Sequence, residues 1–222
     1  MFKKNILLIL FFVFALVFML SSISFAVEKP NLKPLNLSPD QVITLDNEEA
    51  QKIEIKNPRE FLESQNVEIP RNVKDVRVFI QTNDSEKKEL TEQSPDSIET
   101  RSTLTVVPYQ WFTATDWGNM LHEVTGSVGE LTNSVTRSLA VMWSADVSVS
   151  ATVVSAGLGY SVTSSYSVTG TQTVDTGGNY TVMQAYPTYS VTFFDVKNSS
   201  NTIIGGGESI KPRGVAFVVF QY

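Results

Sequence analysis

The 222-residue chain offers few side chains that could carry out a reaction. It contains no cysteine, which excludes thiol nucleophiles, disulfides, iron–sulfur clusters and cysteine-bound zinc. His122 is the single histidine, so a metal site with several histidine ligands is excluded as well. The net charge of −6 argues against non-specific nucleic-acid binding, which depends on lysine and arginine at the phosphates.

His122 could belong to a Ser–His–Asp arrangement completed by Asp116 and one of many serines. No G-x-S-x-G nucleophile elbow accompanies it. The many serines are explained by a sheet with a hydroxyl face. An exposed or capping histidine is therefore the preferred interpretation, and we expect no catalytic residue.

Two glycine-rich sequences could hold a phosphate or a metal ion. The first, 205–209 (Gly-Gly-Gly-Glu-Ser), lacks the G-K-[ST] of a phosphate-binding loop, and we expect a hairpin turn there. The second, 175–179 (Asp-Thr-Gly-Gly-Asn), has no calcium-loop spacing and no second acidic residue nearby, so we expect a turn. The sequence therefore predicts no metal site, no cofactor and no enzyme activity.

Aromatic side chains are the best candidates for binding. Tyr109 and Trp111 lie in an aromatic-rich stretch, and Trp117 breaks the period-two spacing that marks strand positions. Exposed Trp and Tyr rings offer a flat apolar face to sugars or to a membrane interface. Core packing is the ordinary alternative for aromatic residues at period-two spacing. Trp117 is the residue that we most expect to be exposed, with Tyr109 and Trp111 as further ligand-binding candidates.

Residues 1–26 have the organisation of a secretory signal peptide. Lys3 and Lys4 give a positive start, Ile6–Leu20 is an unbroken apolar run, and small residues precede a cleavage expected after Ala26. The apolar run is shorter than the roughly 20 residues that a membrane-spanning helix needs, which disfavours an uncleaved anchor. We therefore expect a secreted protein that works outside the cell.

The rest of the chain divides by composition into three regions. Residues 27–82 are rich in charge and poor in aromatics, and we expect a small α+β unit with a helix at about 58–65. Residues 83–102 form a polar linker, in which Lys87-Lys88 is an exposed place for proteolysis. Residues 103–222 contain every Trp and Tyr and are expected to form the β-domain.

The uncharged stretch between Asp146 and Asp175 indicates the fold class most clearly. Apolar residues alternate with polar ones over 139–153, and again over 154–168 in the opposite phase. The phase change could be a β-bulge, a tight turn or a strand crossing between sheets. We predict a mainly β domain, either an antiparallel sandwich or an elongated sheet, with long Ser/Thr-rich strands.

Residues 139–196 resemble the Ser/Thr-rich β-region of the aerolysin and ETX/MTX2 pore-forming proteins. The resemblance lies in SADVSVSATVVSAGLGYSVTSSYSVTGTQTV and in the Gly-Gly-Asn-Tyr-Thr-Val that follows. It implies an amphipathic hairpin that enters a membrane after assembly into a homo-oligomer. The residues of the implied insertion stretch are Val147, Val149, Ala151, Val153, Leu158, Tyr160 and Val162.

The chain also resembles small secreted proteins of Gram-positive bacteria that share a hydroxyl-rich sheet followed by a K-P-x-G-V-x-F ending, here 211–217. This likeness implies location and fold but no activity. We favour a non-enzymatic protein that binds cell wall, polysaccharide or a membrane surface through its hydroxyl and aromatic sheet. The alternative is a β-pore-forming protein with 27–102 as a shielding or pro-region, and a secreted hydrolase is disfavoured.

Overall fold

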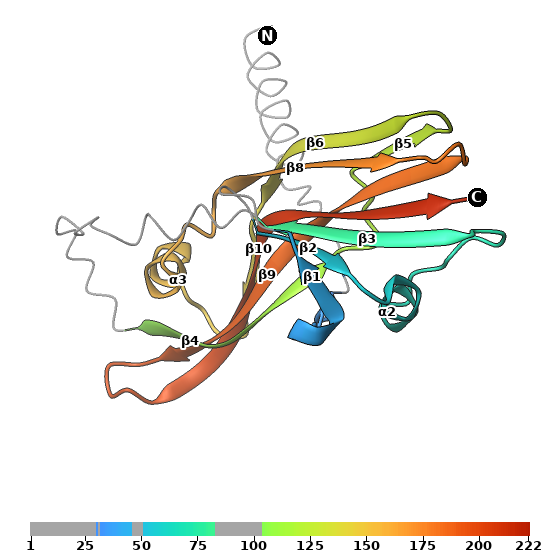
Figure 1. The fold of residues 1–222 in the computed structure, drawn as a ribbon. Helices are drawn as coiled ribbons and strands as arrows, with labels where there is room; N and C mark the ends of the chain where they lie inside the picture. Colours follow the sequence, from blue (N-terminus) through green and yellow to red (C-terminus); the bar gives the residue numbers. More distant parts are fainter. Residues whose placement is uncertain (1–29, 31, 46–50, 83–103) are drawn as a thin grey trace, which may run out of the picture. The chain divides into compact units, whose positions relative to one another are not determined.

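A computed structural model describes residues 30, 32–45, 51–82 and 104–222. All of these except Pro30 belong to one compact unit, Asn31–Tyr222 (Figure 1). The expected signal peptide, its cleavage site after Ala26 and the linker 83–102 with Lys87-Lys88 lie outside the described residues.

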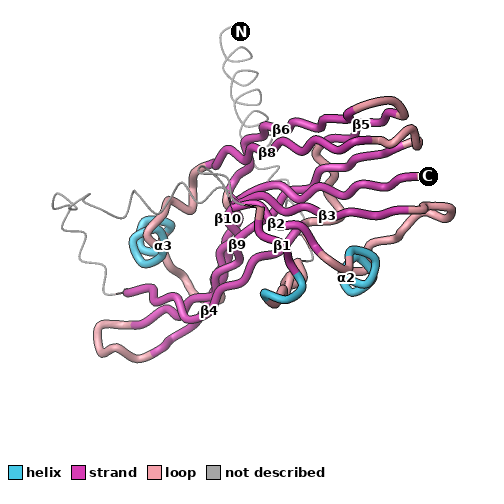
Figure 2. Tube along the Cα trace, in the orientation of Figure 1, coloured by secondary structure: helices cyan, strands magenta, loops and turns pink. Residues whose placement is uncertain are grey.

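The unit is mainly β, as the sequence predicts, and its described residues include the short helical segments η1, α2 and α3, drawn in cyan in Figure 2. The elements in chain order are η1 (Pro39–Gln41), β1 (Val42–Thr44), β2 (Gln51–Ile55), α2 (Pro58–Ser64), β3 (Asp75–Thr82), β4 (Thr105–Thr115), β5 (His122–Gly126), β6 (Glu130–Ala140), β7 (Met142–Ala145), α3 (Ala151–Leu158), β8 (Ser165–Asp175), β9 (Thr181–Lys197) and β10 (Ile203–Gln221).

The main sheet is antiparallel and has the strand order β1-β2-β3-β10-β9-β4. β9 and β10 contain 17 and 19 residues, far more than the usual five or six. Such length lets each strand take different partners along its course. β10 pairs with β7 over 207–210 and with β3 over 214–221, while β9 pairs with β4 and, further toward its start, with β5.

The N-terminal region shares this sheet with the β-domain. β3 pairs with β10 from Thr82–Gly214 to Asp75–Gln221, and β2 pairs with β3 in turn. Regions 27–82 and 103–222, which composition separates, therefore meet in one continuous sheet. α2 forms where the sequence predicts a helix, with Pro58 in its first turn, but the Asn57 side chain makes no capping hydrogen bond.

β6 and β8 form a separate two-stranded sheet that packs over the main one (Figure 1). Their inward side chains alternate with outward hydroxyls, as the Ser/Thr-rich pattern predicts for a strand with one apolar face. Val135, Val168 and Val174 are buried on the inward side against residues that include Phe79 and Phe217 of the main sheet. This apolar layer joins the two sheets into a sandwich.

The alternating stretch does not form two long successive strands, which corrects the interpretation of 139–153 and 154–168. α3 lies across the phase change, so Val153–Val154 is neither a bulge, nor a tight turn, nor a crossing between sheets. Ser150 caps the helix by accepting a hydrogen bond from the Val153 N–H at 3.4 Å. Gly159 ends it with a left-handed φ of 77°.

Packing against the main sheet explains why a helix forms there. Val154 is fully buried with Val106, Phe194 and Val196. Gly157 lies so close to Val106 that an added Cβ would overlap it. The apolar side chains are spaced for either a strand or a short helix, and only contacts with distant residues favour the helix.

The glycine-rich 205–209 is part of β10 and not a turn, which is a second correction. The turn between β9 and β10 lies at 198–201, where Asn201 takes a positive φ of 59°. A side chain at Gly207 would overlap the Phe194 ring and the Ser144 carbonyl oxygen. These glycines therefore permit close packing inside a sheet and do not reverse the chain.

Candidate functional site

Trp117 is not exposed as expected but half-buried in the core. Its ring packs edge-on against Phe61 at 6.2 Å and against Tyr186 at 5.3 Å between ring centroids. Its indole Nε1 donates to Oε1 of Gln65 at 3.4 Å. Trp117 breaks the strand period because it lies in the turn after β4, and that turn folds back over α2.

Tyr109 and Trp111 are exposed on β4, with 61% and 66% of their surfaces accessible. Pro108 pairs with Phe194 and Gln110 with Phe193, so Tyr109 is the extra residue of a β-bulge. The Tyr109 ring stacks on the Phe193 ring, with 6.3 Å between the ring centroids. Trp111 lies two residues further along the strand. Tyr and Trp are enriched at binding interfaces, where one end of the side chain meets an apolar partner and the other meets water.

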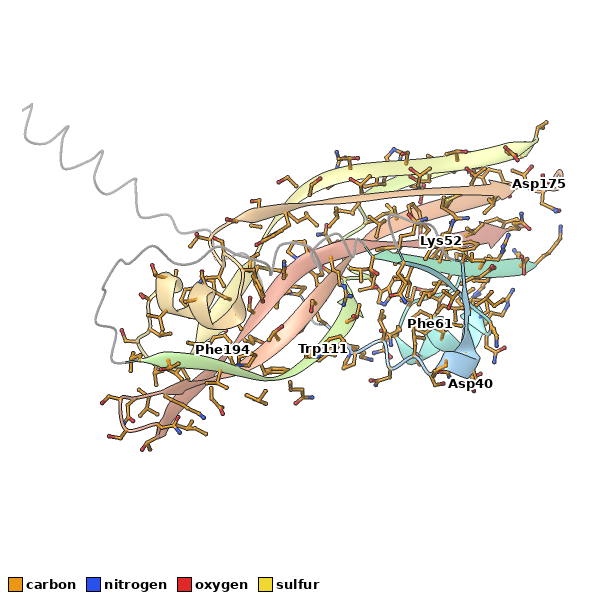
Figure 3. All side chains as sticks on the ribbon, turned by 60° about the vertical axis from the view of Figure 1, so that its left-hand side comes forward. Asp40, Lys52, Phe61, Trp111, Asp175 and Phe194 are labelled. Atoms are coloured by element: carbon orange, nitrogen blue, oxygen red, sulfur yellow. The ribbon has the colours of Figure 1, made fainter. Side chains whose placement is uncertain are left out.

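Trp111 stands at a cleft of about 370 Å³, a volume within the range of small-ligand sites. Figure 3 shows Trp111 where β4 approaches the N-terminal segment. The floor of the cleft is apolar and comes from four parts of the chain: the N-terminal segment, β2, β3 and β4. Its floor residues are Leu35, Leu37, Ile53, Ile80 and Phe112.

The N-terminal segment before η1 forms one wall of this cleft. Pro34 bridges to Ala114, and the Leu35 N–H donates to the Thr113 carbonyl at 2.9 Å. This arm thereby extends the β4 edge of the sheet. Asn36 follows with a positive φ of 44°, a conformation that Asn tolerates better than most residues.

Polar side chains line the cleft beside the apolar floor. Asn36 and Gln51 supply amides, and Thr82 and Thr113 supply hydroxyls. Arg213 supplies a guanidinium from β10. An aromatic platform, an apolar floor and a few polar groups together form the composition of a site for a small or extended polar ligand.

A ladder of hydroxyls covers the outward face of the β6–β8 sheet. Four facing pairs join the strands: Thr132–Thr173, Ser134–Thr171, Thr136–Thr169 and Ser138–Ser167. The first two pairs are hydrogen-bonded at 2.8 Å and the third at 3.5 Å. The hydroxyl and aromatic surfaces, expected as one sheet, thus belong to different sheets of the structure.

The residues of the implied insertion stretch lie in and around α3. Ala151, Val153 and Leu158 are in the helix, and the others flank it in the connections from β7 and to β8. All of them pack on one apolar cluster, which is built around buried side chains of β4 and β9 and in which Val162 itself is buried. The stretch is therefore covered in this structure and does not form a strand hairpin.

His122 and Asp116 have separate partners. Nδ1 of His122 hydrogen-bonds to Oδ1 of Asn133 at 2.8 Å, and Asn133 is fully buried and donates to the Met183 carbonyl at 3.0 Å. Burial raises the pKa of Asp116, and the hydrogen bond that its Oδ1 accepts from the Gly118 N–H at 3.2 Å acts in the opposite direction.

In the ranges that the structure describes, no group of His, Asp and Glu is placed to hold a metal ion.

Sequence reasoning identified Trp111 and Tyr109 but missed the polar residues of the cleft. Asn36, Gln51 and Arg213 come from distant parts of the chain, and no spacing in the sequence relates them. One signal in the sequence that could have pointed to Arg213 is its place in the ending 211–217, between a proline and a glycine.

None of the helices in the described part of the chain has the length and apolar character needed to cross a membrane. No protein-family model matches the chain, and no curated protein matches it.

Proposed function

We propose that this chain is a secreted, non-enzymatic protein that binds a carbohydrate in the cleft at Trp111. The observation behind the proposal is a tryptophan, 66% exposed, at the edge of a cleft with amide and hydroxyl groups. The faces of sugar rings carry C–H groups that pack on an aromatic plane, while their edges carry hydroxyls that need hydrogen-bonding partners. The cleft offers both kinds of contact. Secretion is inferred from the signal-peptide pattern of residues 1–26.

Co-sedimentation with insoluble polysaccharides tests this proposal. Purified protein would be mixed with peptidoglycan, cellulose or chitin, centrifuged, and measured in the pellet. We expect retention on at least one polymer, lost in Trp111→Ala and kept in Tyr180→Ala. Tyr180 is the matched control because it is also an exposed aromatic but lies before β9, outside the cleft. Equal retention of wild type and Trp111→Ala would contradict the proposal.

Membrane insertion is the second candidate, and the β6–β8 pair favours it. Each strand has 11 residues, and a membrane strand needs about 9–11; one face carries hydroxyls and the other is mainly apolar but includes Asn133, Arg137 and Gln172. The resemblance to aerolysin-type proteins points in the same direction. Insertion would require the pair to leave the main sheet and the α3 segment to rearrange.

Liposome leakage tests the second candidate. Protein would be added to dye-loaded vesicles before and after limited proteolysis, and oligomers would be sought on SDS gels. Dye release with SDS-resistant oligomers would support insertion. Intact vesicles at micromolar protein under both conditions would contradict it.

A further inference from the structure

A second hollow adjoins the cleft at Trp111. This α2 hollow lies between the N-terminal segment and α2 and has a volume of about 390 Å³, within the range of small-ligand sites. Leu35, Asn36 and Leu37 line both the hollow and the cleft, so the two share one wall. Phe61 from the hollow and Trp111 from the cleft are both labelled in Figure 3. One ligand that passes over the shared wall would contact both.

The floor of the α2 hollow is apolar and closely packed. Leu35, Ile55 and Phe61 line it with only 7%, 4% and 8% of their surfaces exposed. They belong to the core cluster that joins the N-terminal segment and α2 to β3 and β10. Packing therefore fixes the floor, and it favours apolar side chains of a ligand over hydroxyl groups.

Side-chain amides surround this floor. Gln41 and Gln65 line the hollow and already bind backbone groups: Oε1 of Gln41 accepts from the Ser38 N–H at 3.0 Å, and Nε2 of Gln65 donates to the Pro34 carbonyl at 3.3 Å. Asn57 also lines the hollow and precedes α2, but its side chain makes no capping hydrogen bond. No described residue engages its side-chain amide in another way. This amide can both donate and accept, which suits a peptide group of a ligand.

Lys33 and Glu60 give the hollow one charge of each sign. They are the only ionisable residues among the described residues that line it. Neither forms an ion pair with a residue that the structure describes. A neutral glycan offers no charged partner to either side chain, whereas a short peptide with a free amino group and a free carboxylate offers a partner to each.

We propose that the α2 hollow holds a short peptide joined to the glycan at Trp111, so that the ligand is a peptide-bearing polysaccharide of the peptidoglycan kind. The inference rests on the proposed function and specifies its ligand class. The glycan stacks on Trp111, and the peptide passes over residues 35–37 onto the apolar floor. There Asn57 pairs with a peptide group, Glu60 with an amino group and Lys33 with a carboxylate.

Calorimetric titration with a disaccharide–tetrapeptide fragment of peptidoglycan, and with the same disaccharide without its peptide, tests the inference. The two probes share both sugar rings and differ in the peptide. We expect the conjugate to bind at least about tenfold more tightly, because hydrogen bonds to the peptide add to the contact at Trp111. The free tetrapeptide should bind at least about tenfold more weakly than the conjugate, because it lacks that contact. Trp111→Ala should weaken the binding of both sugar probes.

Two variants of the hollow locate the peptide. Asn57→Ala and Glu60→Gln should each weaken conjugate binding roughly three- to tenfold and leave disaccharide binding unchanged. Acetylation of the peptide's amino group should weaken wild-type binding by a similar factor and have no further effect in Glu60→Gln. Glu63→Gln is the matched control, because Glu63 is also an exposed carboxylate of α2 but lies outside the lining. Unchanged thermal midpoints in the variants would show that the losses reflect binding and not folding.

Four outcomes would overturn the inference. Equal affinity for conjugate and disaccharide, both weakened in Trp111→Ala, would remove the peptide site and leave the proposed function intact. Conjugate binding as tight in both hollow variants as in Glu63→Gln would place the peptide elsewhere. Free tetrapeptide that binds as tightly as the conjugate would show that the glycan is not part of the ligand. Absence of binding to every probe and to every insoluble polysaccharide would overturn the inference and the proposed function together.

Discussion

The side chain of Gln81 on β3 pairs with the backbone of Thr171 on β8 as a neighbouring strand would. Its Nε2 donates to the Thr171 carbonyl at 2.7 Å, and its Oε1 accepts from the Thr171 N–H at 3.0 Å. Gln81 is 7% exposed. Farther along β8, amides of Gln172 and Gln221 donate to the carbonyls of Thr173 and Asp175. Glutamine side chains thus hydrogen-bond to backbone groups of β8, whose only partner strand in the described sheets is β6.

Replacing Gln81 with alanine should destabilise the fold. Both backbone groups of Thr171 would lose their part-buried hydrogen bonds to Gln81, and a typical hydrogen bond contributes about 0.5–1.5 kcal/mol. We expect the free energy of unfolding to fall by about 1–3 kcal/mol in urea denaturation, with faster amide exchange at Thr171. Gln221→Ala removes a more exposed amide and should cost less than about 1 kcal/mol. Equal losses in both variants would contradict this role for Gln81.

Alanine at Gly207 should be far more damaging than alanine at Gly206. A Cβ at Gly207 would overlap the Phe194 ring and the Ser144 carbonyl, whereas at Gly206 the nearest atom is the Phe194 carbonyl oxygen at 3.3 Å. We expect Gly207→Ala to lose about 1–3 kcal/mol, the range for overpacked cores, and Gly206→Ala to change little. Thermal unfolding of the two variants measures the difference. Similar midpoints would mean that 205–207 is not packed inside a strand.

Replacing Trp117 should affect mainly the stability of the fold, and replacing Trp111 should affect mainly ligand binding. Trp117→Ala removes a ring that packs on Phe61 and Tyr186, and core Trp-to-Ala changes cost about 3–5 kcal/mol. Trp111→Ala should change stability by less than about 0.5 kcal/mol, because the ring is mostly exposed. Chemical denaturation combined with polysaccharide co-sedimentation tests both. Loss of binding in a fully folded Trp117→Ala protein would contradict this assignment.

Lys211 and Tyr166 should be energetically coupled. The cation lies 4.6 Å from the ring centroid, and Lys211 is 9% exposed. A double-mutant cycle with Lys211→Met and Tyr166→Leu should give a coupling of about 0.5–2 kcal/mol, the range for cation–π contacts. The four unfolding free energies supply the measurement. A coupling indistinguishable from zero would show that the ring does not stabilise the lysine.

Stability should fall at alkaline pH because of Tyr189. Burial, with a smaller contribution from the Asp116 charge, raises the pKa of Tyr189 to about 12. An unfolded tyrosine loses its proton near pH 10, so between pH 10 and 12 the unfolded state binds fewer protons than the folded state. The unfolding free energy therefore decreases as pH rises through this window and is unaffected by Tyr189 below it.

Tyr189→Phe should flatten this alkaline slope, as measured by urea midpoints at pH 9 and pH 11. A smaller slope should persist, because burial also raises the pKa of Tyr186. A Tyr189→Phe protein with the full wild-type slope would show that other groups cause the loss.

The sequence alone determined the fold class. Period-two alternation of apolar and hydroxyl residues is a local pattern of pleated strands, and it indicated a mainly β chain although part of the stretch 139–168 that carries it forms α3. The helix expected at about 58–65 formed as α2, which is also a local prediction, whereas the exposure of Tyr109 and Trp111 was not predictable because period-two spacing suits core packing equally well. The Asp175-Thr-Gly-Gly-Asn turn also formed as predicted, with Gly177 and Gly178 at positive φ.

Tertiary structure decided what local pattern left undetermined. Alternating small and apolar residues suit a strand or a short helix, and burial of Val154 among β4 and β9 side chains selected the helix α3. Gly207 was indistinguishable from a turn glycine until Phe194 and Ser144 were found against it. The cleft gathers Asn36, Trp111 and Arg213 from three distant segments, because sheet pairing and a bulge set their positions. Such long-range pairing has no local signature, so the candidate site emerged only from the folded chain.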